Sequence, residues 1–274
     1  MDILSSQFKR TPSVPDKPNA FTVGLAMLWA MRVRNPDPSG QGVVDHGHYA
    51  TALSALQRGG IPALAEQRGA LKDYFAELSQ IDPDTLSRDE SLAYWLNLYN
   101  AGALDLALDA WHRGEPTVLR IPQEFSRRFI QVAGETLSLH DIEHGKVRRF
   151  KEPRIHGALN CGSVSCPKLQ PIPYTGDGLD EQLEEQMRRF FTLGGIELDV
   201  AANLVWLSRI FLWFSGDFVR SQRMPSWFPA GKRDLLKAVQ KWLDEDTVAW
   251  LEQASPKVEF QPYDWGLRCA VGSG

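Results

Sequence analysis

The residue types best suited to chemistry gather in one short segment, RIHGALNCGSVSCP, which runs from Arg154 to Pro167. It holds two thiols, Cys161 and Cys166, and an imidazole, His156, five residues before the first thiol. In many thiol enzymes, an imidazole takes the proton of a neighbouring thiol, and the resulting thiolate is the nucleophile. The same residue types also form buried structural clusters, so the segment predicts either a nucleophilic site or a buried polar network.

Position within the segment favours Cys161 as the nucleophile. An apolar alternation predicts a strand over Arg154 to Asn160, and Gly162 leaves a backbone N–H open as an oxyanion donor. Cys166 precedes Pro167, which has no N–H to offer. The candidate catalytic residues are Cys161, His144, His156, Glu143 and Asn100, and the candidate substrate-binding residues are Asn97, Arg154 and Cys166.

The predicted strand bears on the choice of base. The alternation of side chains along a strand points His156 to the face opposite to Cys161. His144 lies on a separate predicted helix, so this restriction on reaching the Cys161 sulfur does not apply to it. We expect an imidazole nitrogen of His156 or His144 within about 4 Å of the Cys161 sulfur. If neither imidazole lies close to either sulfur, the thiol-enzyme hypothesis should be dropped in favour of a non-catalytic scaffold.

Two helices must position the candidate partners. Apolar residues recur at helical spacing from Leu92 to Trp111 and predict a helix buried on more than one side. Asn97 and Asn100 share one face of it, and hydrogen bonding to neighbouring loops is favoured over a direct role. Ser87 and Glu90 match a capping box before this helix.

The second helix is predicted over Leu139 to Arg149, after a capping Ser138, and it carries Glu143 and His144. The order HDIEH differs from the HExxH zinc signature. A metal site drawn from His144, His156, Cys161 and Cys166 has suitable residue types, but their spacing does not match a compact zinc motif. We expect no metal and no cofactor.

The remaining periodicities predict an α+β protein. Its N-terminal half is helical and packs on a central antiparallel sheet. Aromatic residues around Phe211, Trp213, Phe214 and Phe218 are expected in the core. Further helices are predicted over residues 21–34, 49–56, 64–78, 179–191, 233–242 and 246–253, a strand over 129–135, and a hairpin over 196–200 and 203–208.

Composition narrows the classes of protein. The 274 residues carry a net charge of −4 with an isoelectric point near 5.9, which leaves no basic footprint for nucleic acid. Three cysteines are too few for a secreted scaffold held by several disulfides, although an exported protein could form one Cys161–Cys166 bridge. The apolar run over residues 21–31 is too short to span a membrane, so a cytoplasmic location is expected. Residues 1–42 read as a loose tail and linker, and residues 43–268 as a single domain.

Several motifs in order carry a family resemblance. They are AYWLNLYNA (93–101), LSLHDIEHG (137–145), PRIHGALNCGSVSCP (153–167), WLSRIFLWFSGDF (206–218) and YDW (263–265). Together, over Asp45 to Leu267, the chain resembles the domain of unknown function 547 family. The candidate site residues match the family pattern. The chain departs from it at His140, where the family has Asp, and at Arg268, where it has Asn.

The resemblance leaves the activity open. The first hypothesis is a cysteine-dependent hydrolase or acyl transferase, similar to papain-like and transglutaminase-like enzymes, acting on an amide, ester or thioester of a small molecule or peptide. The alternative is a non-catalytic binding or scaffold module, in which the same residues form a buried polar network. A metal-binding site is the third hypothesis.

Overall fold

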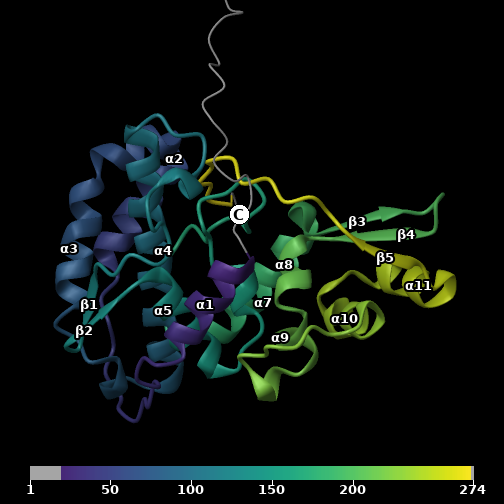
Figure 1. The fold of residues 1–274 in the computed structure, drawn as a ribbon, viewed down its shortest axis with the longest axis horizontal. Helices are drawn as coiled ribbons and strands as arrows, with labels where there is room; N and C mark the ends of the chain where they lie inside the picture. Colours follow the sequence, from purple (N-terminus) through teal and green to yellow (C-terminus); the bar gives the residue numbers. More distant parts are fainter. Residues whose placement is uncertain (1–19, 273–274) are drawn as a thin grey trace, which may run out of the picture.

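The computed structural model of the chain describes residues 20–272, so only residues 1–19 of the expected tail and linker lie outside that range at the N-terminal end. The prediction of one α+β domain is confirmed, with a helical N-terminal half (Figure 1). The helices of that half are α1 (Ala20–Ala30), α2 (Gly47–Glu66), α3 (Arg68–Leu78), α4 (Arg88–His112), α5 (Leu139–Gly145) and a single turn, α6 (Ile155–Ala158).

The C-terminal half is built from shorter helices and a small sheet. Its helices are α7 (Leu179–Phe190), α8 (Arg209–Trp213), α9 (Ser215–Val219), α10 (Lys232–Val239) and α11 (Glu245–Ala254). Single turns of other helix types are η1 (Pro83–Thr85), η2 (Val118–Arg120), η3 (Val147–Phe150), η4 (Phe191–Gly195), η5 (Ser221–Arg223) and η6 (Gln240–Trp242). The helices predicted from periodicity are present within a few residues at most ends.

Helix α4 is the centre of the larger core, as its apolar breadth predicted. It begins where the Ser87 hydroxyl accepts the Glu90 N–H at 3.2 Å. The Glu90 carboxylate does not return to Ser87. It accepts the backbone N–H groups of Val44 and Gly176 instead, and so joins two distant loops to the helix start. Helices α2, α3, α5 and α7 surround α4.

The β structure is small and lies at the edges, which corrects the predicted central antiparallel sheet for the part of the chain described. Strands β1 (Ile130–Val132) and β2 (Glu135–Leu137) form an antiparallel hairpin. Strands β3 (Ile196–Asp199), β4 (Leu204–Leu207) and β5 (Lys257–Phe260) form a second sheet, in which β3–β4 is antiparallel and β4–β5 parallel. With three or four residues each, these strands are too short to form a central layer.

The strand predicted over Arg154 to Asn160 is also wrong. The chain makes the helical turn α6 there and becomes extended only at Leu159. All four residues of the turn are buried, so no alternation of buried and exposed side chains is present. Gly157 explains the close packing, because a Cβ at this position would lie 2.4 Å from the Met187 sulfur of α7.

Two further contacts place the ends of the described chain. Residues 30–34 dock on α5 and η3, where Lys146 Nζ donates to the Arg34 carbonyl and Arg149 to the Met31 carbonyl. At the other end, the C-terminal segment returns from β5 to the middle of the molecule (Figure 1). It pairs there with the loop after α6, through bridges of Ser163 with Leu267 and Leu169 with Val271. No helix within residues 20–272 is long and apolar enough to cross a membrane.

The predicted aromatic core forms around a second, smaller hydrophobic cluster. Phe211 and Phe218 are buried there, with ring centroids 5.0 Å apart. Trp213 is 43% exposed and stacks on Trp265, so it lies outside the core. Phe214 stacks on the ring of His156 with centroids 3.9 Å apart.

Candidate functional site

The two thiols of the central segment lie side by side in the loop after α6. Both cysteines are free, and their sulfur atoms are 2.8 Å apart. Asn160 shapes the loop, because its amide accepts the Gly162 N–H at 2.8 Å and donates to the Pro167 carbonyl at 2.7 Å. Gly162 has φ +84°, a left-handed conformation that favours glycine, and this bend brings the two cysteines together.

Hydrogen-bond donors converge on Cys166 rather than on Cys161. The Cys161 backbone N–H donates to the Cys166 sulfur at 3.1 Å, and the Tyr263 hydroxyl lies 3.1 Å from it. The Cys161 sulfur lies 3.4 Å from the same hydroxyl and 3.3 Å from the Ser163 hydroxyl. The pair can therefore share a proton, and the donors lie closer to the Cys166 sulfur than to the Cys161 sulfur.

The electrostatics of the pair agree with this geometry. Burial alone would raise the pKa of Cys166, but hydrogen bonds from Cys161, from Tyr263 and from backbone N–H groups lower it below the ordinary value. The hydrogen bond to Cys166, together with burial, raises the pKa of Cys161 well above the ordinary value. The hydrogen-bond geometry and the opposite directions of the two pKa shifts both favour Cys166 over Cys161 as the site of a thiolate.

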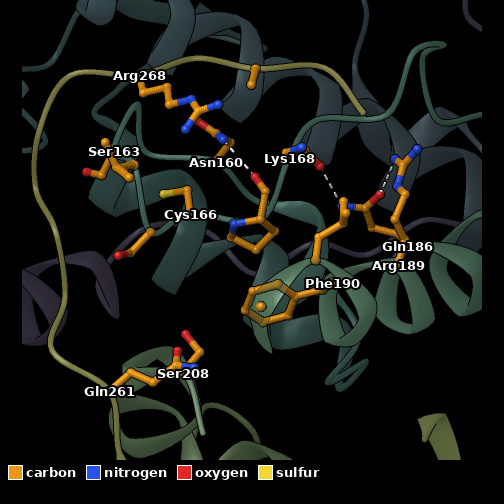
Figure 2. A pocket seen from close by; sticks show the side chains of 16 residues that line it. Asn160, Ser163, Cys166, Lys168, Gln186, Arg189, Phe190, Ser208, Gln261 and Arg268 are labelled. Carbon is orange, nitrogen blue, oxygen red and sulfur yellow. Dashed lines mark hydrogen bonds between the residues drawn. The ribbon is translucent and has the colours of Figure 1, made fainter. Parts of the chain in front are cut away.

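Cys166 lines a cavity of about 360 Å³ between the loop, α7 and the returning C-terminal segment (Figure 2). The charged side chains of this cavity are all cationic: Lys168, Arg189 and Arg268. Polar uncharged residues make up much of the remaining wall, and no Asp or Glu contributes to it. Figure 2 shows the three cationic residues on one side, with Ser208 and Gln261 opposite.

The three cations differ in how they are held. Arg189 is fixed by its hydrogen bond to the Gln186 side chain at 2.6 Å, and its Nε is buried without a partner. Lys168 and Arg268 form no side-chain hydrogen bond or ion pair with any other residue in the described range of 20–272. Charged donors are therefore available along this wall.

His156 lies in a buried ion network and not beside the thiols. Its Nε2 donates to Asp217 Oδ2 at 2.9 Å, and Arg148 donates to the same oxygen at 2.7 Å. The side chains of all three residues are at most 1% exposed. Burial lowers the pKa of His156 in spite of Asp217, so the imidazole is neutral and carries its proton on Nε2.

His144 belongs to the same network. Its Nδ1 lies 3.3 Å from Arg148 Nη1, and because a guanidinium only donates, this nitrogen must be the acceptor. Burial and the positive charge of Arg148 lower the pKa of His144 well below its ordinary value. Within residues 20–272, neither imidazole forms a hydrogen bond with a cysteine sulfur, so the predicted pairing of thiol and imidazole is not found.

Glu143 lies beside the ion network and is hydrogen-bonded to Tyr99. Its Oε2 accepts the Tyr99 hydroxyl at 3.2 Å, and burial raises its pKa to about 7. Tyr99 is also within electrostatic reach of Glu143, Cys161 and Cys166, which together with burial raise its pKa. Glu143 is therefore linked to the ion network directly, through Arg148 and Asp217, and to the thiols only by way of Tyr99.

The two asparagines of α4 hold loops, as their favoured interpretation predicted. The Asn97 side chain donates to the Tyr174 carbonyl and accepts the N–H of the same residue. The Asn100 side chain donates to the Ala158 carbonyl and accepts the Asn160 N–H at 2.9 Å. Asn100 therefore fixes the point at which the thiol loop leaves α6.

Arg154 is occupied by carboxylates at the start of α6. Its guanidinium makes two hydrogen bonds to Glu152, at 2.9 and 2.8 Å, and one to Asp180 at 2.7 Å. These partners raise the pKa of an already basic group, so Arg154 keeps its charge. Arg154 thus pairs with Glu152 and Asp180 and ties the start of α6 to the start of α7.

The metal hypothesis has no support in residues 20–272, where no three His, Cys, Asp or Glu side chains are grouped to hold a metal ion. His144 and His156 lie in the ion network, apart from the thiol pair.

Sequence reasoning missed several residues of the site. Tyr263 lies 97 residues from Cys166, and Asp217 lies 61 residues from His156. Both fall in motifs noted above, YDW and WFSGDF, which could have indicated a structural connection. The cationic residues of the cavity, Lys168, Arg189 and Arg268, lie outside those motifs. They come from a loop, a helix and the C-terminal segment, which only the fold brings together.

Comparison with known proteins places the central part of this site in a family. Residues 83–191 match the family model described as protein of unknown function, DUF547. The matched segment begins with η1 and ends at the first residue of η4, and over it the resemblance drawn from the motifs is confirmed. The comparisons found no match among curated proteins and none among solved structures.

Proposed function

We propose that the protein is a binding module for an anionic small molecule or peptide end, held in the cavity beside Cys166. The observation that carries the proposal is the charge of the wall, which includes Lys168, Arg189 and Arg268 and no carboxylate. The whole chain is acidic, with a net charge of −4, so a wholly cationic cavity is not a consequence of composition.

The size of the cavity and the charges in its wall support this role. About 360 Å³ lies within the range of small-molecule sites. Arg189 also lines the cavity, and the Gln186 side chain holds its guanidinium in place. Lys168 and Arg268 supply further charges, and charge-assisted hydrogen bonds are stronger than neutral ones.

The ion network suits the scaffold part of the same proposal. Arg148, His156 and Asp217 satisfy one another in the interior and tie α6 to α9 and η3. A hydrolase of the papain kind needs an imidazole to take the proton of its thiol. Both candidate imidazoles have other partners, so the binding module is favoured over the hydrolase.

The test is a calorimetric titration of the full chain with pyrophosphate and with succinate at low and high salt. Binding should weaken with salt, and the double variant Lys168→Gln, Arg268→Gln should lose about ten-fold or more in affinity, since each charged hydrogen bond contributes about 1.5–3 kcal/mol. The control double variant Lys72→Gln, Arg113→Gln removes exposed cations elsewhere and should bind as the parent does. Equal binding by the two double variants, or no binding by the parent, would exclude the proposal.

A further inference from the structure

We propose that Cys161 and Cys166 are a redox-active dithiol, which reduces small-molecule disulfides and closes to an intramolecular disulfide. The proposal goes beyond anion binding and stands on the geometry of the loop. The two free sulfurs are 2.8 Å apart, whereas the S–S bond of a disulfide measures about 2.05 Å. Less than about 1 Å of movement separates the dithiol from the bonded state.

The loop holds the pair in this arrangement without the bond. The Asn160 side chain bridges Gly162 and Pro167, the residues that follow each cysteine. Asn100 fixes the N–H of Asn160 in turn. The fold already holds the two sulfurs together, so closing the ring costs little further conformational entropy. This favours an intramolecular disulfide over an intermolecular one.

The geometry assigns different roles to the two thiols. Cys166 accepts the Cys161 N–H and the Tyr263 hydroxyl, both at 3.1 Å, and these donors stabilise a thiolate. Cys166 also lines the cavity, where a disulfide can reach it. Cys161 does not line the cavity and lies directly behind Cys166, as a resolving thiol must.

The chemistry balances with a small disulfide, R–S–S–R, as the oxidant. The Cys166 thiolate attacks one sulfur, forming the mixed disulfide Cys166–S–S–R and releasing R–S⁻. Cys161 then loses its proton to solvent or to the released thiolate and attacks the Cys166 sulfur, which expels the second R–S⁻. The dithiol loses two electrons, the small disulfide gains them, and two molecules of R–SH result.

The third cysteine supplies an internal control. Cys269 is 7% exposed, and burial raises its pKa to about 12. It forms no hydrogen bond with either thiol in the described chain, and it is expected to stay reduced and to alkylate slowly. Any difference in reactivity then reports on the pair and not on cysteine content.

The experiment treats the reduced full chain with glutathione disulfide, which is anionic, and with neutral 2-hydroxyethyl disulfide, and follows the products by mass spectrometry. The parent should lose about 2 Da and two titratable thiols. Cys161→Ser should accumulate a mixed disulfide at Cys166, Cys166→Ser should react at least about ten-fold more slowly, and Cys269→Ser should behave as the parent.

Two further measurements keep the test decisive if a variant fails to fold. In the parent, Cys166 should alkylate fastest of the three cysteines near neutral pH, and Tyr263→Phe should slow it by removing a donor to the thiolate. Alkylation of Cys166 no faster than that of Cys269, or a parent that forms only mixed disulfides, would overturn the proposal. The two probes separate the proposals: if the cavity binds no anion, both disulfides still oxidise the pair, but without a preference for the anionic one.

Discussion

At the residue scale, a small number of buried charges explains why the expected histidine–cysteine pairing does not form. Asp217 is fully buried, and it accepts hydrogen bonds from Arg148, His156 and the Ser226 backbone. Burial alone would raise the pKa of Asp217, but its donors His156 and Arg148 lower it below the ordinary range. The ionised carboxylate of Asp217 thus binds the His156 imidazole, which is then not available as a partner for a thiol.

The substitution Asp217→Asn should destabilise the fold by about 3–5 kcal/mol, because it leaves Arg148 as a buried charge without a counter-ion. Urea denaturation measures the loss. In the double variant Arg148→Met, Asp217→Asn the uncompensated charge is gone, and part of the stability should return. A single variant as stable as the parent would mean that the network contributes little.

Glu143 predicts a dependence of stability on pH. Its pKa in the folded protein is raised to about 7, so between about pH 4.5 and 7 the folded state retains a proton that the unfolded state has lost. This carboxyl therefore contributes a free energy of unfolding that falls as pH rises through that window, by at most about 3 kcal/mol.

The substitution Glu143→Gln removes that contribution. Denaturation at about pH 5 and pH 8 should show a smaller fall in stability with pH for the variant than for the parent. Glu252→Gln removes an exposed carboxyl from α11 and serves as the control. A fall in the Glu143→Gln variant as large as that of the parent would contradict the assigned pKa.

At the element scale, α4 could be predicted and α6 could not, for a physical reason. The 25 residues of α4 repeat their apolar positions at helical spacing over many turns, so local pattern and tertiary burial agree. The four residues of α6 are too few for a period to appear, and they pack closely against α7, where a Cβ on Gly157 would collide with the Met187 side chain. The same holds for the site: the thiol loop was visible as a motif, whereas Tyr263 reaches it only through the fold.

Truncation of a buried side chain of α4 tests whether this helix forms the centre of the hydrophobic core. Leu96 is fully buried, and Leu96→Ala should lower the free energy of unfolding by about 2–5 kcal/mol through lost burial and a residual cavity. Leu28→Ala, at a position on α1 that is 56% exposed, should change it little. Thermal melts of both variants provide the comparison, and equal effects would place α4 outside the core.

At the scale of the whole molecule, two hydrophobic clusters share helix α7. Leu179 and Leu183 of this helix belong to the larger cluster, and Met187 and Phe190 to the smaller. The ion pair of Arg148 with Asp217 joins η3 to α9 across the same region. The two halves visible in Figure 1 are therefore connected by a common helix and a buried charge pair.

This connection predicts one cooperative unfolding transition. Neither cluster can lose its packing without exposing one face of α7, so both should unfold together. Far-ultraviolet circular dichroism and tryptophan fluorescence, recorded during one urea titration, should give coincident midpoints. Separate midpoints would mean that the C-terminal half unfolds on its own.

The most direct test of the account is a crystal structure of the reduced protein soaked with a heavy oxyanion such as tungstate. The anion should lie in the cavity beside Cys166, within hydrogen-bond distance of at least one of Lys168, Arg189 and Arg268. Two results would contradict the account. One is an anion that binds only outside the cavity, and the other is a cavity without anion density in a crystal whose surface sites are occupied.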